Sequence, residues 1–420
     1  MPSLLSWVDS DGKLIFAARI VRSFSYGFLS IILAIYLRLI GLDDILIGVV
    51  LSATLVNSVL LTLVASFYAD KLGRRKILLI YAAMMSLSGA IFLLTENYVA
   101  LVAAALVGTI NVTGTETGSF LSVEQAILPQ TVTDSSKRNT AYAVYNMVGT
   151  FAMSGGILLA GLPSLLQNFL SITQADSMRP LFLLYIILGI AVLAMYSRLT
   201  RHVELATASG HNEGRPKSRV GGLSHESQRI VGKLSGLFAV DAFAGGFVIQ
   251  SIVSFWFFTK FGVDLTTLSY IFSIAGVLTA FSFLAAAKMA NRIGLVNTMV
   301  FTHIPSNILL ILVGFAPTLP LAIGLYLARM AISQMDVPTR QAYIVTVVRE
   351  DERIAAAGIT NVSRNVSQAL SPSLTGYLLQ SLPLLSAPFL LSGALKIVYD
   401  VVLFLKFRNI APRGDGKKSD

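Results

Sequence analysis

Long apolar stretches separated by short polar loops make up most of this chain. A helix needs about 20 apolar residues to cross a bilayer core about 30 Å thick, and on this measure the pattern predicts twelve crossings. The first six run over residues 14–40, 45–68, 77–95, 98–118, 141–162 and 180–196. The second six run over residues 230–258, 268–289, 298–315, 319–335, 354–379 and 388–405. The pattern therefore predicts an all-α integral membrane protein.

The longest polar segment, residues 198–229, separates the sixth crossing from the seventh. It contains Gly, Ser, His and mixed charge, as is typical of a solvated linker. We therefore expect a six-helix bundle over residues 1–197, a cytoplasmic linker over 198–229, and a second bundle with a short cytoplasmic tail over 230–420. The first apolar stretch carries Arg19 and Arg22 and lacks a small-residue cleavage site, so we expect it to remain as a membrane helix.

Composition supports a protein that faces lipid. Hydrophobic residues make up 55% of the 420 residues and charged residues only 13%, whereas soluble proteins carry about 25% charged residues. The net charge is +10, and most basic residues lie on the side of the membrane that holds the N-terminus, the linker and the C-terminus. On the opposite side, the only basic residues in the loops are Arg38, Arg179 and Lys260. The positive-inside rule then places both termini in the cytoplasm, in a multi-pass protein of the cell membrane. Because the basic residues follow the loops and form no single stripe, we expect no nucleic-acid partner.

Several kinds of chemistry find no support in the sequence. The chain has no cysteine, which excludes disulfides and thiolate metal sites. His303 stands alone in an apolar stretch, and the other three histidines share one polar segment, so we expect no metal site. No phosphate-binding loop or clustered nucleophile and base is present. We therefore expect no cofactor and no enzymatic activity, and a membrane-embedded receptor or enzyme is the rival interpretation.

The two halves repeat each other. The run ADKLG after the second crossing matches ANRIG after the eighth, and Gln125-Ala126 matches Gln341-Ala342. Arg22 in the first crossing aligns with Asp241 in the seventh. These matches, in order and at nearly the same spacing, predict a duplicated unit and two pseudo-symmetric six-helix bundles. Transporters built in this way hold substrate near the membrane midplane between their halves.

Residues 66–76 read SFYADKLGRRK and resemble the signature loop of the major facilitator superfamily, G-x-x-x-D-[RK]-x-G-R-[RK]-[RK]. The segment departs from the pattern at Ser66, and the second copy has Asn291 in place of the aspartate. The resemblance implies the twelve-helix fold of that family and secondary transport of a small molecule by alternating access. It also implies that Asp70, Gly73 and Arg74 belong to a latch between the two halves on the cytoplasmic side. The alternative is that the basic residues of this loop only fix the orientation of the chain in the membrane.

Ionisable residues at membrane depth are candidates for function. Arg22 and Asp241 lie at similar depths on helices expected to face each other, so we predict that they pair. The pair is either a permanent ion pair that holds the two halves together, or one that is broken when substrate binds or Asp241 is protonated. Lys396 and Asp400 are four residues apart, so we expect them to share a helix face and neutralise each other.

Two arginines then lack an acidic partner, and this favours a substrate with an anionic or strongly hydrogen-bonding group. The predicted substrate and proton pathway consists of Arg22, Tyr26, Asp241, Gln250, Arg329, Asn361 and Arg364. Near the cytoplasmic ends, Glu124 and Arg340 occupy equivalent repeat positions with opposite charge, and Asp336 lies beside them. We predict that they form a cytoplasmic gate, the alternative being solvated helix ends.

The resulting hypothesis is a monomeric secondary active transporter in the lipid bilayer that moves a small-molecule substrate by alternating access. The proton gradient would drive it through Asp241 or Glu124. The sequence leaves two directions open, efflux of a drug or metabolite and uptake of an organic anion.

Overall fold

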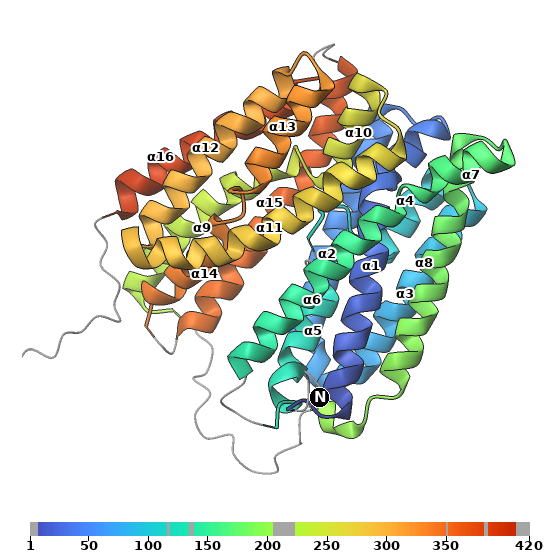
Figure 1. Cartoon of the computed structure of the whole chain (residues 1–420). Helices are drawn as coiled ribbons and strands as arrows, with labels where there is room; N and C mark the ends of the chain where they lie inside the picture. The colour runs from blue at the N-terminus through green and yellow to red at the C-terminus, as the bar shows by residue number, and fades with distance from the viewer. Residues whose placement is uncertain are drawn as a thin grey trace, which may run out of the picture. The chain divides into compact units, whose positions relative to one another are not determined.

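The computed structural model describes residues 7–115, 118–133, 138–204, 223–349, 352–381 and 385–408, which are built almost entirely of α-helices (Figure 1). In the first half these are α1 (Ser10–Leu39), α2 (Asp44–Leu72), α3 (Arg74–Leu94), α4 (Tyr98–Val107), α5 (Ser119–Ile127), α6 (Arg138–Leu159), α7 (Leu162–Leu170) and α8 (Gln174–Ser197). In the second half they are α9 (His225–Gly246), α10 (Gln250–Phe261), α11 (Leu265–Ile293), α12 (Leu295–Phe315), α13 (Leu319–Met330), α14 (Asp336–Thr346), α15 (Arg353–Ser381) and α16 (Ala387–Phe407). An all-α membrane fold is confirmed.

Nine helical spans among the described residues are long and apolar enough to cross a membrane. The other three of the twelve expected crossings are either interrupted or less apolar. The fourth crossing is divided into α4 and α5, and the tenth into α13 and α14. The eleventh, α15, is long but carries many polar residues. Two interrupted crossings and one polar crossing therefore account for the difference between twelve and nine among the described residues.

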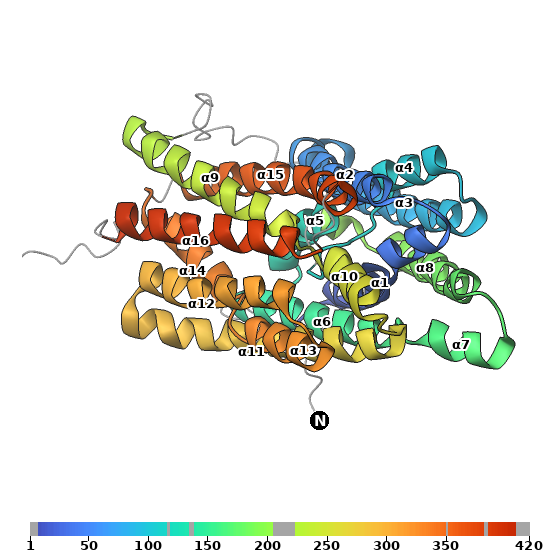
Figure 2. The same ribbon diagram turned by 90° about the horizontal axis from the view of Figure 1, so that it is seen from above.

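By their internal contacts, the described residues fall into two compact units. The first unit comprises residues 1–209 and 249–276, and the second comprises 210–248 and 277–420. In the first unit α1 packs against α6 and α8, and α3 packs against α8. In the second unit α9 lies beside α15, and α12 lies beside α16, as both views show (Figures 1 and 2). The predicted division of the chain into two six-helix bundles joined by a linker at residues 198–229 stays a proposal.

The seventh crossing, expected as one helix over residues 230–258, is broken after Gly245 and Gly246, where α9 ends and α10 begins. Consecutive glycines weaken a helix because they lose more backbone freedom than other residues. Beyond the break, α10 packs against α1 within the first unit. Ser251 Oγ donates a hydrogen bond to the Ser30 carbonyl at 2.7 Å, and Ser254 Oγ donates to the Ile31 carbonyl at 3.0 Å.

The fourth crossing, expected as one helix over residues 98–118, is also broken. Its middle is not helical, because Gly114 (φ +78°) and Gly118 (φ +110°) adopt conformations that a helix does not use. Asn111 stabilises the non-helical segment. Its Oδ1 accepts a hydrogen bond from the Thr113 N–H at 2.9 Å, and its Nδ2 donates to the Thr115 carbonyl at 2.8 Å. Glu116 and Thr117 lie outside the described residues.

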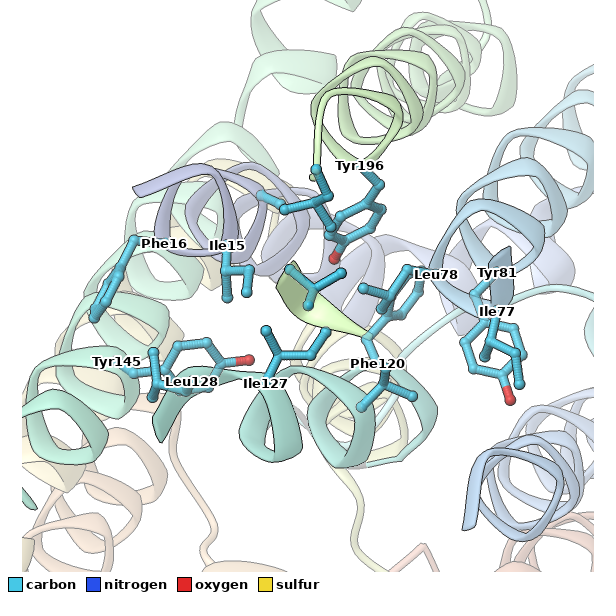
Figure 3. Packing of buried hydrophobic residues seen from close by; sticks show 14 of the residues in the cluster. Ile15, Phe16, Ile77, Leu78, Tyr81, Phe120, Ile127, Leu128, Tyr145 and Tyr196 are labelled. Atoms are coloured by element: carbon cyan, nitrogen blue, oxygen red, sulfur yellow. The ribbon is translucent and has the colours of Figure 1, made fainter. Parts of the chain in front are cut away.

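An apolar cluster in the first unit joins α1, α3, α5, α6 and α8 (Figure 3). Figure 3 shows Ile15, Leu78, Phe120 and Ile127 gathered around the space into which the hydroxyl ends of Tyr145 and Tyr196 point. Phe120 stacks on Tyr196, with ring centroids 6.0 Å apart. This cluster surrounds the polar groups described next and keeps water from them.

Candidate functional site

A buried charge network lies inside the first unit, centred on Arg22 of α1 and Glu124 of α5. The guanidinium donates to both carboxylate oxygens, at 3.2 Å and 2.6 Å. Both side chains are fully buried. Tyr196 Oη donates to Glu124 Oε1 at 2.7 Å, and Tyr145 donates to Oε2. Two-point contact between an arginine and a carboxylate is strong and directional, so Arg22 and Glu124 form a neutral pair with its hydrogen bonds satisfied.

A second network lies inside the second unit, centred on Asp241 of α9. Lys396 Nζ lies 2.6 Å from Asp241 Oδ1, and Arg364 Nη1 lies 2.7 Å from Oδ2. Arg340 Nη1 is 3.4 Å from Oδ2 and 2.6 Å from Asp336. Asp241 is only 2% exposed. Three cations around one buried carboxylate favour its ionised form, because each offsets the cost of desolvating the negative charge.

His303 on α12 connects this network to a second carboxylate. Its Nδ1 lies 2.9 Å from Asp400 Oδ1, and its Nε2 lies 4.0 Å from Asp241 Oδ1. Asn307 Nδ2 donates to the other Asp400 oxygen at 3.0 Å. His303 therefore lies between the two carboxylates, and an imidazole in such a position can bridge them by its two ring nitrogens.

Helical spacing brings these side chains together. His303 and Asn307, Asp336 and Arg340, and Lys396 and Asp400 are each four residues apart on α12, α14 and α16. Residues at this spacing lie on one helix face, so each helix directs two polar groups toward the network. The expectation that Lys396 neutralises Asp400 is wrong. Lys396 binds Asp241, while Asp400 binds His303 and Asn307.

The predicted pairings of Arg22 with Asp241 and of Glu124 with Arg340 would join residues of different units and stay predictions, while each residue has partners within its own unit. Arg22 binds Glu124, and Asp241 binds Lys396, Arg364 and Arg340. The repeat equivalence remains informative, because the same two positions pair within each unit with opposite polarity. A buried charge is stabilised by an opposite charge close to it, and each of these charges has such a partner within its own unit.

The signature loop forms a tight turn at Gly73, whose φ of +99° suits glycine. The Arg74 side chain is only 7% exposed. Its guanidinium donates to the Ala126 carbonyl at 3.2 Å, in the last turn of α5, where helix carbonyls attract a cation. The Glu204 carboxylate accepts hydrogen bonds from the Arg74 and Arg75 backbone N–H groups at the start of α3. The side chain of Asp70 lies outside what the structure describes.

The remaining predicted residues lie apart from the two networks. Tyr26 of α1 is buried, and Gln250 at the start of α10 donates to Ser30 Oγ at 2.8 Å. Asn361 on α15 is exposed. Arg329 is half-buried in the last turn of α13, and no described acidic group lies within ion-pair distance of it. At that position its charge complements the dipole of α13.

Sequence reasoning missed the contacts of His303, Tyr145 and Tyr196, and it expected Lys396 and Asp400 to pair with each other. The signal for the second network was the recurrence of polar pairs four residues apart in apolar helices. Tyr145 and Tyr196 carried no comparable signal, because tyrosine is common in membrane helices. Among the described residues, no three His, Asp or Glu side chains are arranged to hold a metal ion.

Comparison with known proteins places these features in a family. The family model described as Major Facilitator Superfamily matches residues 15–335 and 242–420. A Saccharomyces cerevisiae protein described as uncharacterised membrane protein YJR124C is 27% identical over 95% of this chain and 94% of its own length.

Solved transporters share the fold at low identity. A variant of the nucleoside transporter NupG has a TM-score of 0.75 and 13% identity, covering 95% of this chain and 100% of that one. A D-xylose–proton symporter has a TM-score of 0.70 and 13% identity, covering 96% and 99%. From the family match and the helical fold, this chain belongs to the major facilitator superfamily and is a multi-pass membrane transporter rather than an enzyme.

Proposed function

We propose that this transporter couples solute movement to protons, and that the His303–Asp241–Asp400 group is where the proton binds. The observation that carries the proposal is the buried imidazole between two carboxylates. Histidine as a residue type changes charge near neutral pH, and nearby carboxylates stabilise the charge that an imidazole gains.

The charge balance of the second unit supports this assignment. Three carboxylates (Asp241, Asp336, Asp400) face three cations (Arg340, Arg364, Lys396). With His303 neutral the network has no net charge, and protonation adds one positive charge to a buried site. Electrostatic energies are large in such surroundings. One proton can therefore shift the balance between two conformations that solvate the network differently.

His303 replaces Asp241 and Glu124, the two residues suggested by the sequence, as the proposed site of proton binding. Glu124 is held by Arg22 and two tyrosines, and Asp241 is held by three cations. In both cases neutralising the carboxylate would leave buried positive charge without its partner, which is costly. Protonated His303 faces no such penalty because Asp400 lies 2.9 Å away.

We further propose export of a small drug or metabolite, with organic-anion uptake as the alternative. Arg364, one of the two arginines that suggested an anionic substrate, is bound to Asp241, and this favours the first. An exporter moves solute in the direction opposite to protons, whereas the uptake system moves solute in the same direction as protons. Solute accumulation in proteoliposomes, measured with the pH gradient imposed in each direction, therefore separates the two. Location in the cell membrane, cytoplasmic termini and a monomeric state remain part of the proposal.

The test is transport by purified protein in proteoliposomes, with substrates drawn from a screen under an imposed pH gradient. We expect His303→Gln to abolish gradient-driven accumulation and to retain downhill exchange, because only the proton-carrying step is lost. His225→Gln is the matched control, because His225 is exposed at the start of α9 and should behave as wild type. Undiminished accumulation by His303→Gln, with the same dependence on pH, would contradict the proposal.

A further inference from the structure

The two nitrogens of the His303 ring face different groups of the second unit. Nδ1 lies 2.9 Å from Asp400 Oδ1, and Nε2 lies 4.0 Å from Asp241 Oδ1. The Tyr399 ring packs edge-on against the imidazole, with centroids 6.2 Å apart and planes at 87°. His303 is only 5% exposed. Packing and hydrogen bonding therefore fix which nitrogen points toward which carboxylate.

Asp400 is the nearer carboxylate, and it depends on neutral donors. It is fully buried, and no described arginine or lysine lies within ion-pair distance of it. Asn307, one turn further along α12, donates through Nδ2 to Asp400 Oδ2 at 3.0 Å. A buried carboxylate is costly unless its oxygens accept hydrogen bonds. The amide supplies one donor, and a hydrogen on His303 Nδ1 would supply the second at Oδ1.

The Asn307 amide is oriented as an ionised Asp400 requires. Asn307 is buried, and its Oδ1 has no hydrogen-bond partner within the described chain. Turning the amide over would place this oxygen against Asp400 Oδ2, where two acceptors would meet unless Asp400 carried a proton. The observed orientation therefore matches a carboxylate that accepts from both sides.

We propose that Asp400 and Asn307 are positioning residues for proton coupling, and that they hold the neutral His303 ring with its hydrogen on Nδ1. The hydrogen bond made by one ring nitrogen sets the state of the other. Nε2 then keeps its lone pair and is the atom that gains and loses the proton. The inference rests on the coupling proposed above and assigns the atom at which it takes place.

Nε2 faces a carboxylate oxygen that is already bound. Lys396 Nζ lies 2.6 Å from Asp241 Oδ1, the same oxygen that Nε2 faces. A proton from water adds to the Nε2 lone pair, and the new N–H points toward this oxygen. The imidazolium and the ammonium group then share one acceptor at short range, where like charges repel. Proton uptake at Nε2 therefore weakens the contact between Lys396 and Asp241.

The other charged groups of the network reach His303 only through the carboxylates. Arg340 of α14 and Arg364 of α15 lie within ion-pair distance of Asp241. Neither they nor any charged group from the described part of α13 lies within that distance of His303. The state of the ring is therefore set by its two carboxylates and by Lys396.

The test is solid-state ¹⁵N NMR of the full-length protein in liposomes, labelled with ¹⁵N-histidine. The chain has four histidines, and the signals of His303 are identified by their loss in His303→Gln. In the neutral form, reached by raising the pH, we expect Nδ1 to show the shift of a nitrogen that carries hydrogen and Nε2 that of one that does not. Hydrogen on Nε2, or a ring that stays charged at every pH, would overturn the proposal.

Variants test the positioning role. Asp400→Asn should lower the ratio of Nδ1–H to Nε2–H rings about tenfold, because a hydrogen bond to a charged acceptor is lost. Asn307→Leu should lower it less, since the carboxylate stays and loses one donor. Asp336→Asn is the matched control, because it also removes a carboxylate of this unit, but one bound to Arg340 at 2.6 Å. An unchanged ratio in Asp400→Asn, or an equal change in the control, would refute the role of Asp400. The wild-type spectrum decides the tautomer even if a variant does not fold.

The step at Lys396 is measured in the same way with ¹⁵N-lysine. The Nζ signal of Lys396, identified by its loss in Lys396→Met, should shift over the pH range in which Nε2 of His303 gains its proton. It should stay constant in His303→Gln. A Lys396 signal that does not follow the charge of His303 would show that the proton leaves the Asp241 contact unchanged.

The spectra and the transport assay separate the two proposals. If the hydrogen lies on Nδ1 while His303→Gln still accumulates substrate along the gradient, only the coupling proposal fails. If His303→Gln loses accumulation while the hydrogen of the neutral wild-type ring lies on Nε2, coupling at His303 stands and the positioning role of Asp400 and Asn307 fails.

Discussion

At the scale of single residues, the buried ion pair of Arg22 and Glu124 is the place in the first unit where we expect the loss of one side chain to lower the stability of the protein strongly. Four side chains from α1, α5, α6 and α8 meet at the Glu124 carboxylate. Removing one charge leaves the other buried without its partner, which costs more than removing both.

We therefore expect Arg22→Met to destabilise the protein by about 3–5 kcal/mol, measured by equilibrium unfolding in mixed micelles. The double change Arg22→Met with Glu124→Leu should recover most of this loss, because it leaves no unpaired charge. Arg179→Met serves as the comparison, since Arg179 and Glu96 form an exposed pair worth about 0–1 kcal/mol. Equal losses in Arg22→Met and the double variant would contradict the pairing.

A second residue-scale prediction concerns Glu352, which precedes α15 and lies outside the spans. Burial raises its pKa, but hydrogen bonds from Ser227 Oγ and from the Ser224 and Arg349 backbone N–H groups outweigh this and lower it to about 2. A carboxyl with a lowered pKa stabilises the folded state above its unfolded value, 4.5, and loses that contribution as the pH falls toward 2.

Glu352→Gln should therefore lower the unfolding temperature at pH 7, and the gap between variant and wild type should narrow as the pH falls below 4.5 and close as the pH approaches about 2. Thermal unfolding at a series of pH values measures this gap. A gap that stays constant over that range would show that the carboxylate charge does not contribute.

At the scale of elements, helix ends and interruptions carry the particular features of this chain. The two broken crossings at equivalent places in the repeat differ in chemistry. The break in the tenth crossing has Arg329 at the end of α13 and Asp336 at the start of α14, each matching the helix dipole. The break in the fourth crossing relies on Asn111 and glycines instead.

The turn between α2 and α3 gives an element-scale prediction. Gly73→Ala should destabilise the protein by about 1–3 kcal/mol, because a side chain at φ +99° is strained. Gly232→Ala should change stability in the opposite direction by about 0.5–1 kcal/mol, since Gly232 lies inside α9 with open space around its Cβ position. Unfolding of both variants under one condition tests the sign. Stabilisation by Gly73→Ala would exclude a conformational need for glycine there.

At the scale of the whole molecule, each unit contains a buried charge network that closes on itself. The Arg22–Glu124 and Asp241–Arg340 pairs occupy equivalent positions with reversed polarity. Because each network finds its partners within one unit, movement between conformations does not require these ion pairs to break.

The family resemblance assigns Asp70 to a latch between the halves, which gives the prediction at this scale. Asp70→Asn should shift the population toward the inward-open state and slow transport while expression stays normal. Single cysteines introduced into this cysteine-free chain report accessibility from either side. Lys71→Gln, a charge change at the next position, should leave labelling unchanged. Wild-type labelling and full transport in Asp70→Asn would restrict the loop to a role in topology.

The sequence by itself determined the membrane class, the repeat, the family and the positions where charge is buried. Each of these follows from local pattern, since about 20 apolar residues form a span and a charge inside a span is rare enough to identify a candidate site. The tight turn at Gly73 was likewise predictable, because only the signature run and a glycine were needed.

Only the tertiary structure decided which buried charges pair and where helices break. More than one buried carboxylate could pair with Arg22, and spacing along the sequence does not tell which helix lies nearest to it. His303 was overlooked for the same reason, because its two carboxylates come from α9 and α16, far away in the chain. The broken fourth crossing depends on glycine conformations and on Asn111 bonding its own backbone, and the apolar pattern alone does not reveal either.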